Sequence, residues 1–395
     1  MSKFLSKTIL FASLILRPSP SPTTSSILGF IRNPNVFQLR WLSSSSNQQS
    51  FAVSYLINSF GFSPESALSA SRYVNFQTPE KPDKLIHLFK KYGFTQTQIS
   101  SIVRISPKLL SFDAEKTILP KLEFFEAKGI SGPEMAKMLS VFPTILRCSL
   151  DRQIMPSYDF VRNLFQSDET AVSAVKRFPD ILRNVVKHVA PNVDILRSHG
   201  VPDPKIATLL KNWPKVFIAS PNSFRKIVEK VECSGFDASK VNFVLAVVAF
   251  SIVDKSRWQS KINVYKKWGW SEEEVAKAFQ RNPWCMVHSE DKLTASMNFF
   301  INQMGWRPCH LAKCTTILGL SLKKRVVPRC SVFQVLLSKG LVEKEVSLHA
   351  LLIVPEEKFL QEFVLPYKEE APELLKLYKQ KLDRSSGPHI DDMIC

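Results

Sequence analysis

The 395-residue chain is 45% hydrophobic and poor in glycine, with 12 Gly against 25 Pro. This composition favours long helices interrupted at defined points and argues against a turn-rich β fold. The net charge is +18, and residues 43–355 alone hold 42 Lys and Arg against 26 Asp and Glu. An excess of this size attracts polyanions. No run of 18 apolar residues is present, so the sequence predicts no membrane-spanning helix.

Residues 1–45 have the composition of an organelle transit peptide. The first 50 residues contain 12 Ser and no acidic residue, and Arg40 lies just ahead of a Trp-Leu-Ser sequence that is typical of a processing site. We interpret this segment as a mitochondrial transit peptide, with the chloroplast as the alternative destination. A secretory signal built on Lys3 and Lys7 is disfavoured, because no small-residue cleavage site follows the apolar stretch.

Seven cysteines are scattered along the chain without C-x-x-C spacing. An odd number of this kind predicts reduced thiols within the core rather than a disulfide framework. Cys309, His310 and Cys314 lie close together, but no second pair follows at zinc spacing. We therefore expect no metal and no cofactor.

A repeat of about 35 residues organises the middle of the chain. Most of its few glycines recur with spacings of 32, 36, 71, 35, 34, 36 and 35, and the long spacing spans two periods with a glycine missing near Gln166. Self-similarity at this period predicts a helical solenoid. The glycines are Gly61, Gly93, Gly129, Gly200, Gly235, Gly269, Gly305 and Gly340.

A proline motif of the form Pro-x-φ-φ, in which φ is an apolar residue, has the same period. Degenerate copies begin at Phe250 and Thr315, and a second set of prolines, at 120, 156, 191 and 328, follows 12 or 13 residues after the motif. Since a residue before proline leaves the α region, each motif ends a helix. The motifs begin at Pro107, Pro143, Pro179, Pro214 and Pro283.

Each repeat is predicted to contain two helices. Helix one starts after the glycine, as at Ser271, which with Glu274 forms a capping box, and its apolar residues follow helical spacing, as in Ile99 to Ile105. Helix two starts near residues such as Asp113 and ends at the next glycine. Because neither helix buries its apolar face alone, neighbouring repeats must stack.

The position of the proline distinguishes this repeat from other helical repeats of similar length. Four motif prolines follow the boundary glycine by 14 residues, as Pro107 follows Gly93. This arrangement resembles the mitochondrial transcription termination factor (mTERF) family. Residues 318–329, which contain Ser-Leu-Lys-Lys-Arg-Val-Val-Pro-Arg, are similar to its C-terminal S-L-x-x-R-φ-x-P-R signature, and residues 48–58 resemble the start of the plant-type branch.

The resemblance, which covers residues 48 to 383, implies an all-α, right-handed-type solenoid bent into a half-ring, with about eight to nine repeats. It also implies a positively charged concave face that binds organelle DNA or RNA, and functions in transcription termination or initiation, intron splicing or ribosome assembly. We expect an array over residues 46–355, followed over 356–395 by one helix and a disordered tail. We further expect a monomer, with organelle transcription or splicing proteins as further partners.

Basic residues beside the proline motif are the predicted nucleic-acid contacts, because a solenoid places equivalent positions along one edge, where cations neutralise successive phosphates. The alternative is that they are solvated or stabilise helix C-termini. Catalytic motifs such as a phosphate-binding Gly-rich loop, H-E-x-x-H or G-x-S-x-G are absent, so we expect no enzyme. A protein-binding scaffold is the other class left open. The predicted contacts are Lys108, Arg147, Arg183, Lys215, Arg281, Lys323, Lys324, Arg325 and Arg329.

Overall fold

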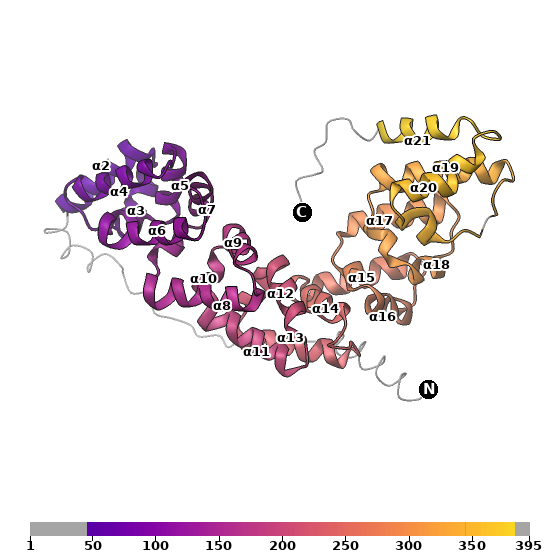
Figure 1. The fold of residues 1–395 in the computed structure, drawn as a ribbon, viewed down its shortest axis with the longest axis horizontal. Coiled ribbons are helices and arrows are strands. Elements are labelled where there is room, and N and C mark those ends of the chain that lie inside the picture. Colours follow the sequence, from indigo (N-terminus) through magenta and orange to yellow (C-terminus); the bar gives the residue numbers. More distant parts are fainter. Residues whose placement is uncertain (1–45, 344, 384–395) are drawn as a thin grey trace, which may run out of the picture. The chain divides into compact units, whose positions relative to one another are not determined.

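The computed structural model describes residues 46–343 and 345–383, and the predicted transit peptide and C-terminal tail lie outside this part. The described residues form helices and short connections with no strand, which confirms the all-α prediction (Figure 1). They divide into two compact units, an N-terminal unit up to Phe224 and a C-terminal unit from Arg225. The predicted half-ring and the number of repeats stay predictions.

The N-terminal unit consists of short helices joined in pairs, and α13 (Pro221–Cys233) contains the division between the units. Its other helices are α2 (Ser46–Phe60), α3 (Pro64–Ser71), α4 (Glu80–Lys91), α5 (Gln96–Ile105), α6 (Leu119–Ala127), α7 (Gly132–Val141), α8 (Met155–Phe165), α9 (Asp168–Arg177), α10 (Asp180–Asn184), α11 (Ala190–Ser198) and α12 (Asp203–Asn212).

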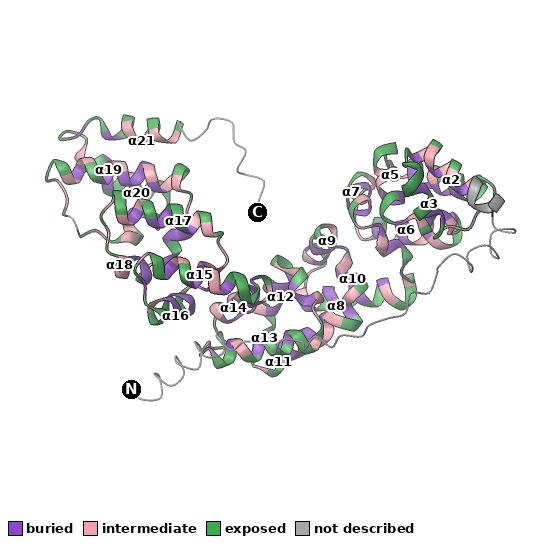
Figure 2. Cartoon of the chain, turned by 180° about the vertical axis from the view of Figure 1, so that it is seen from behind, coloured by how far each residue is buried: buried purple, intermediate pink, exposed green. Residues whose placement is uncertain are grey.

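The C-terminal unit repeats the same pairing. Its helices are α14 (Val241–Ile252), α15 (Lys255–Lys267), α16 (Glu272–Arg281), α17 (Glu290–Asn298), α18 (Pro308–Lys313), α19 (Val327–Ser338), α20 (Glu356–Phe363) and α21 (Leu374–Asp383). In both units, most helices carry buried residues on one side and exposed residues on the other (Figure 2).

The repeat boundary is set by backbone conformation. All eight boundary glycines have left-handed φ values between +64° and +87°, and Gln166 takes the place of the missing ninth with φ +52°. A left-handed residue after the last helical turn lets the chain reverse direction, and glycine adopts it without a Cβ clash. The predicted period is therefore a period of left-handed helix ends, kept even where the glycine is lost.

Helix one begins and ends as predicted. Ser271 accepts a hydrogen bond from the Glu274 N–H, and the Glu274 carboxylate accepts one from the Ser271 N–H at 2.9 Å. The helix ends just before the motif, which forms a short 3₁₀ turn in η1 (Pro107–Ser111), η3 (Pro143–Arg147), η6 (Pro214–Ile218), η7 (Pro283–Met286) and η9 (Thr315–Gly319), whereas after Pro179 it forms α10. The last residue of helix one departs from the apolar pattern in two repeats, since Ile105 is 50% and Val141 58% exposed.

Helix two begins with a π turn wherever the second proline is present. Before Pro120, the Leu119 N–H bonds back to Ala114, five residues earlier, and this wide turn accommodates a residue that cannot continue an α-helical ladder. The turns are η2 (Ala114–Ile118), η4 (Leu150–Ile154), η5 (Val185–Val189) and η10 (Leu322–Val326). Two more π turns do not begin a helix two: η8 (Phe299–Gln303) follows α17, and η11 (His349–Ile353) is followed by Pro355, the N-cap residue of α20.

The two degenerate motifs behave differently. Thr315 still starts a 3₁₀ turn, whereas α14 continues through Phe250 to Ile252. Loss of the proline alone does not decide between these outcomes; in α14 the helical Phe250 stacks on Trp258, with 4.5 Å between ring centroids.

The C-terminal segment differs from the prediction of one helix after residue 355. Two helices, α20 and α21, are joined by the 3₁₀ turn η12 (Leu365–Tyr367). Phe359 and Tyr378 are buried, and α21 packs on α19. Both helices therefore belong to the core of the C-terminal unit, because they cover apolar surface that the last repeat would otherwise expose.

Candidate nucleic-acid interface

A buried polar side chain on helix two connects consecutive repeats. The Lys121 Nζ donates to the Leu146 carbonyl at 2.6 Å, at the end of the next motif turn, and Asn192 donates to Phe217 and Ala219, each at 2.9 Å. These carbonyls have no partner within their short turns, so a donor from the preceding repeat satisfies them. We call this position the staple position.

The staple position has the same register in the repeats that use it, whereas Ser157 and Ser296 at this register are buried without a hydrogen-bond partner. It follows the residue before helix two by eight positions where a π turn is present, as from Asp113 to Lys121, and by seven where helix two begins with regular α turns, as from Asp254 to Lys261. Lys261 likewise donates to the His288 carbonyl. The π turn is thus a one-residue insertion that keeps the staple facing the next motif turn.

Arg329 occupies the staple position of the last repeat, and this corrects its prediction as a nucleic-acid contact. It is only 2% exposed, its Nη1 donates to Val354 at 2.8 Å and to Leu351 at 3.3 Å, and its guanidinium lies 4.6 Å from the Phe359 ring centroid. Burial lowers the pKa of Arg329. A group enclosed in this way has no surface to offer a phosphate.

Arg325 has a similar role. Its Nε and Nη2 donate to the carbonyls of Leu352, Ile353 and Val354 at 2.6–2.8 Å. Both arginines of the C-terminal signature therefore hold the segment after the last repeat. Lys323 and Lys324, which directly precede Arg325 in the sequence, are exposed.

The remaining predicted contacts are exposed but do not share one position in the repeat. Lys108 and Lys215 follow the motif proline by one residue, Arg147 and Arg183 by four, and Arg281 precedes it by two. Arg183 pairs with Asp180 at 3.4 Å and the Arg281 Nη1 lies 3.5 Å from the Ala312 carbonyl. The assumption of a single row of equivalent cations is therefore wrong for these five residues.

A row of equivalent cations exists elsewhere, at the third position after the residue that precedes helix two. Six of the seven repeats from Asp113 to Ser321 have Lys or Arg there, and Ser223 is the exception. We call these residues the helix-two row: Lys116, Arg152, Lys187, Arg257, Lys292 and Lys324.

The helix-two row has the same backbone geometry in five of its six members. The backbone N–H of Lys116 donates to the Asp113 side chain at 2.8 Å, and that of Arg152 to the Ser149 side chain at 3.3 Å. The same bond, from the backbone N–H to the side chain three residues earlier, is made by Arg257, Lys292 and Lys324. The first turn of a helix carries partial positive charge, so cations there are mildly unfavourable. Local helix stability therefore does not explain their recurrence.

The members of the helix-two row differ in their side-chain contacts. Lys116, Arg152, Lys187 and Lys324 are exposed. Arg257 pairs with Asp254 at 2.6 Å, and the part-buried Lys292 donates to Gly319 at 2.8 Å. Sequence reasoning missed the row because it counted from the proline; counting from the residue that caps helix two identifies it.

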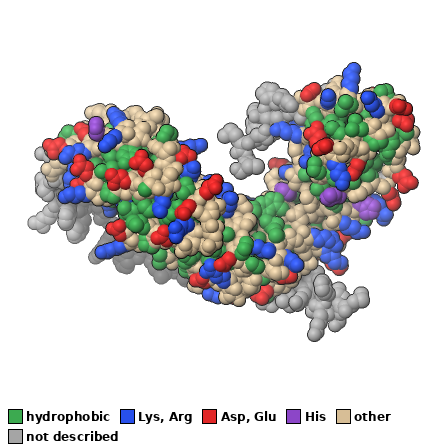
Figure 3. Space-filling model, in the orientation of Figure 1, with side chains coloured by type: hydrophobic (Ala, Val, Ile, Leu, Met, Phe, Trp, Pro, Cys, Tyr) green, Lys and Arg blue, Asp and Glu red, His purple; other side chains and the backbone are tan. Residues whose placement is uncertain are grey.

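Packing brings the row together within each unit. In the N-terminal unit, η3 contacts α10 and α10 contacts η6, and in the C-terminal unit η7 contacts η9. Since helix two begins a few residues after each of these segments, its first turns lie along one edge of each unit. Figure 3 shows Lys and Arg side chains interleaved with Asp and Glu on both units, so the regular row, rather than a single-sign patch, is the feature that suggests an interface.

Among the thiols, Cys148, Cys285 and Cys330 are buried as predicted, whereas Cys233 is exposed, which corrects the expectation of a core thiol there.

His288, whose carbonyl accepts the Lys261 staple, has a strongly lowered pKa. Burial of the ring, with smaller contributions from the charges of Lys292 and Lys261, lowers the pKa of His288 to about 4. Its imidazole is neutral at pH 7 in the folded state. In the described ranges, no helix is long and apolar enough to cross a membrane.

Comparison with known proteins extends these observations. The chain is 21% identical over 236 residues to "Transcription termination factor MTERF15, mitochondrial" of Arabidopsis thaliana, an alignment that covers 51% of this chain and 53% of that protein. It is 25% identical over 194 residues to "Transcription termination factor MTERF8, chloroplastic" of the same species, covering 49% and 38%. The chain thus aligns with about half or less of either relative's length. The mTERF family profile matches residues 86–252 and 246–360, most of the repeat array. The chain therefore belongs to the mTERF family.

Proposed function

We propose that this protein binds nucleic acid in an organelle through the helix-two row and regulates transcription there. The observation that carries the proposal is the recurrence of Lys or Arg at one position in six of seven repeats, where the helix dipole disfavours a cation. Lys116, Arg152, Lys187 and Lys324 are the exposed members that carry it furthest, because Arg257 pairs with Asp254 and Lys292 donates to the Gly319 carbonyl. Cations at equivalent places in stacked repeats contact successive phosphates and confer affinity without base readout. The names of both relatives, transcription termination factors of a mitochondrion and of a chloroplast, support an organelle and a role in transcription.

The mitochondrion is the proposed organelle, and the chloroplast is the alternative. The Ser-rich, acid-free composition of residues 1–45 supports import into either. Fusion of residues 1–45 to a fluorescent protein in plant cells separates the two, since we expect the signal to coincide with a mitochondrial dye. Coincidence with chlorophyll would assign the protein to the chloroplast instead.

Duplex binding across a salt titration tests the interface. Each phosphate neutralised by the protein contributes about 0.9 to the slope of log affinity against log salt on B-DNA. The triple variant K116Q/R152Q/K187Q is therefore expected to reduce the magnitude of that slope by roughly two to three. The matched control K90Q/K91Q/K137Q changes the same charge at exposed lysines of the same unit that lie outside the row.

The two triple variants distinguish specific contacts from general charge. Equal slopes for both would show that net charge alone attracts the nucleic acid, and the helix-two row would be refuted as the interface. Absence of binding by the unmodified chain even at low salt would favour a protein-binding scaffold. Repeating the titration with duplex RNA of the same sequence tests the alternative of an RNA-binding splicing or ribosome-assembly factor.

A further inference from the structure

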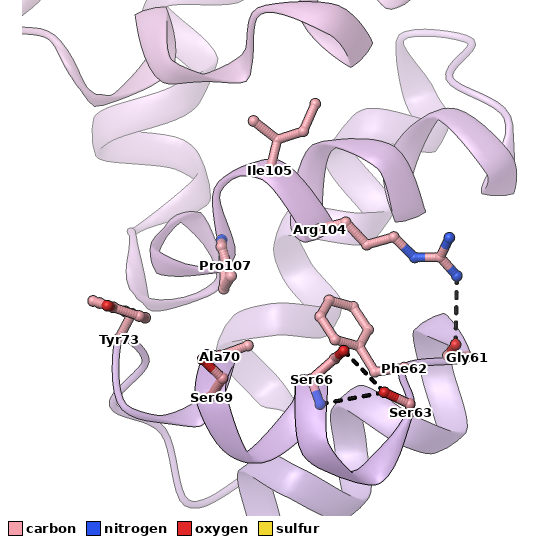
Figure 4. Close-up of a pocket in the computed structure, with 10 residues that line it drawn as sticks. All are labelled: Gly61, Phe62, Ser63, Ser66, Ser69, Ala70, Tyr73, Arg104, Ile105 and Pro107. Atoms are coloured by element: carbon pink, nitrogen blue, oxygen red, sulfur yellow. Dashed lines mark hydrogen bonds between the residues drawn. The ribbon is translucent and has the colours of Figure 1, made fainter.

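A groove of about 660 Å³ lies between α3 and the end of α5 in the N-terminal unit (Figure 4). One wall is formed by α3 and includes Ser66 and Ser69, with Tyr73 just after the helix. The other is formed by Arg104 and Ile105 at the end of α5, and by the first motif proline, Pro107. The helix-two row does not contribute to it.

The groove exists because the stacking of first helices is interrupted here. Further along the unit, α5 packs on α7 and α7 on α9, whereas α3 makes its main contacts with α2. At eight residues, α3 is also shorter than the ten-residue α5, α7 and α9. Ile105, the last residue of α5, is 50% exposed and adds an apolar side chain to the groove wall.

The two ends of the groove differ in chemistry. Tyr73, at one end in Figure 4, is 66% exposed and is the only exposed Phe, Tyr or Trp side chain in the described parts of the chain. Arg104, at the other end, is held by hydrogen bonds from its Nη2 to the carbonyls of Phe60 and Gly61 at 3.2 and 3.4 Å. Arg104 and Tyr73 thus line opposite ends of one groove, with serine side chains between them and no acidic residue in the lining, and the Arg104 guanidinium is turned toward Gly61 (Figure 4).

We propose that this groove binds an unpaired nucleotide of a single-stranded nucleic acid segment, with its base stacked on Tyr73 and a phosphate on Arg104. Stacking on an exposed aromatic side chain, combined with a cation that contacts the backbone, is the general means of binding single strands. Hydroxyls such as those of Ser66 and Ser69 provide hydrogen bonds to a base edge or a ribose. This inference rests on the proposed function and adds a single-strand site to a duplex-binding row.

The test compares a blunt DNA duplex with the same duplex carrying a short single-stranded extension that contains 2-aminopurine. Loss of one stacked base costs about 1–3 kcal/mol, so for Tyr73→Ala we expect roughly tenfold or greater loss of affinity for the extended duplex. Affinity for the blunt duplex should stay unchanged. Quenching of 2-aminopurine fluorescence, which reports stacking, should disappear in the variant.

Two controls isolate the groove. Leu68→Ala removes an exposed apolar side chain of α3 that does not line the groove, and Arg72→Gln removes a neighbouring exposed charge. Neither should alter binding to the extended duplex, whereas Arg104→Gln should weaken it.

If Tyr73→Ala binds the extended duplex as tightly as the unmodified chain, the proposal is overturned and the groove is left to a protein partner. An equal loss on blunt and extended duplexes would also overturn it. Failure of the unmodified chain to bind either duplex would instead refute the proposed function itself.

Discussion

Replacing Arg329 with methionine removes a buried guanidinium from the C-terminal unit while keeping an apolar side chain in its place. The variant loses two hydrogen bonds from a charged donor to Leu351 and Val354 and a cation–π contact with Phe359. Two such bonds at about 1.5 kcal/mol each and a cation–π contact of about 1 kcal/mol are partly offset, because the guanidinium no longer has to be desolvated. We expect a net destabilisation of about 3 kcal/mol.

Thermal unfolding followed by circular dichroism measures this loss. For a folded unit of this size, about 3 kcal/mol lowers the midpoint by roughly 6–12 °C. Lys323→Met is the matched control, because Lys323 lies in the same helix two but its side chain is exposed. This change should leave the unfolding midpoint nearly unchanged. Duplex affinity of the folded Arg329→Met variant should equal that of the unmodified chain.

The reasoning would be refuted by the opposite pattern. If Arg329→Met unfolded at the normal temperature and lost affinity, the guanidinium would contact nucleic acid, as the sequence motif alone suggested. The staple position would then have no structural role in the last repeat.

Three further predictions concern local features of the fold. Gln166→Gly should stabilise the N-terminal unit by about 0.5–1 kcal/mol in urea unfolding, because glycine adopts φ +52° without strain. Gly200→Ala should destabilise the same unit by about 1 kcal/mol, and a stabilising Gly200→Ala would contradict this account. Ser271→Ala should cost about 1 kcal/mol through loss of the capping box, and a neutral result would show that tertiary packing alone fixes the start of α16. His288 has a pKa of about 4 when folded against an ordinary value near 6.5, so only the unfolded state binds its proton between these values and stability should fall as pH drops from about 6.5 to 4. Urea titrations at several pH values measure this, and in His288→Gln the free energy of unfolding should change by about 3 kcal/mol less over this pH range. Identical pH dependence in the two proteins would exclude this histidine as the cause.

The period, the helix pairs and the family were predictable because they depend on local signals. A left-handed residue, a capping box and a proline each act within a few residues of their own position, so they determine the same conformation in almost any context. The loss of glycine at Gln166 did not alter the period, because the preceding helix still needs a left-handed end. The fate of Phe250 was less predictable, since continuation of α14 depends on the packing of Trp258.

The candidate site was predicted only in part, because a sequence shows which side chains are charged but not where their charges point. Arg325 and Arg329 occur in the same basic segment as Lys323 and Lys324, yet the first two satisfy backbone carbonyls about 25 residues further along the chain. Such a contact depends on the stacking of one repeat on the next. The groove beside Tyr73 likewise exists only because α3 packs on α2.

The sequence by itself therefore determined a basic, all-helical repeat of the mTERF family, because helix ends are local and recur with the period. Only the tertiary structure decided which cations are buried staples, which form the helix-two row and where the layer of first helices opens. These outcomes depend on contacts between repeats, and side chains of the same charge in neighbouring positions reach different surroundings once the repeats have packed.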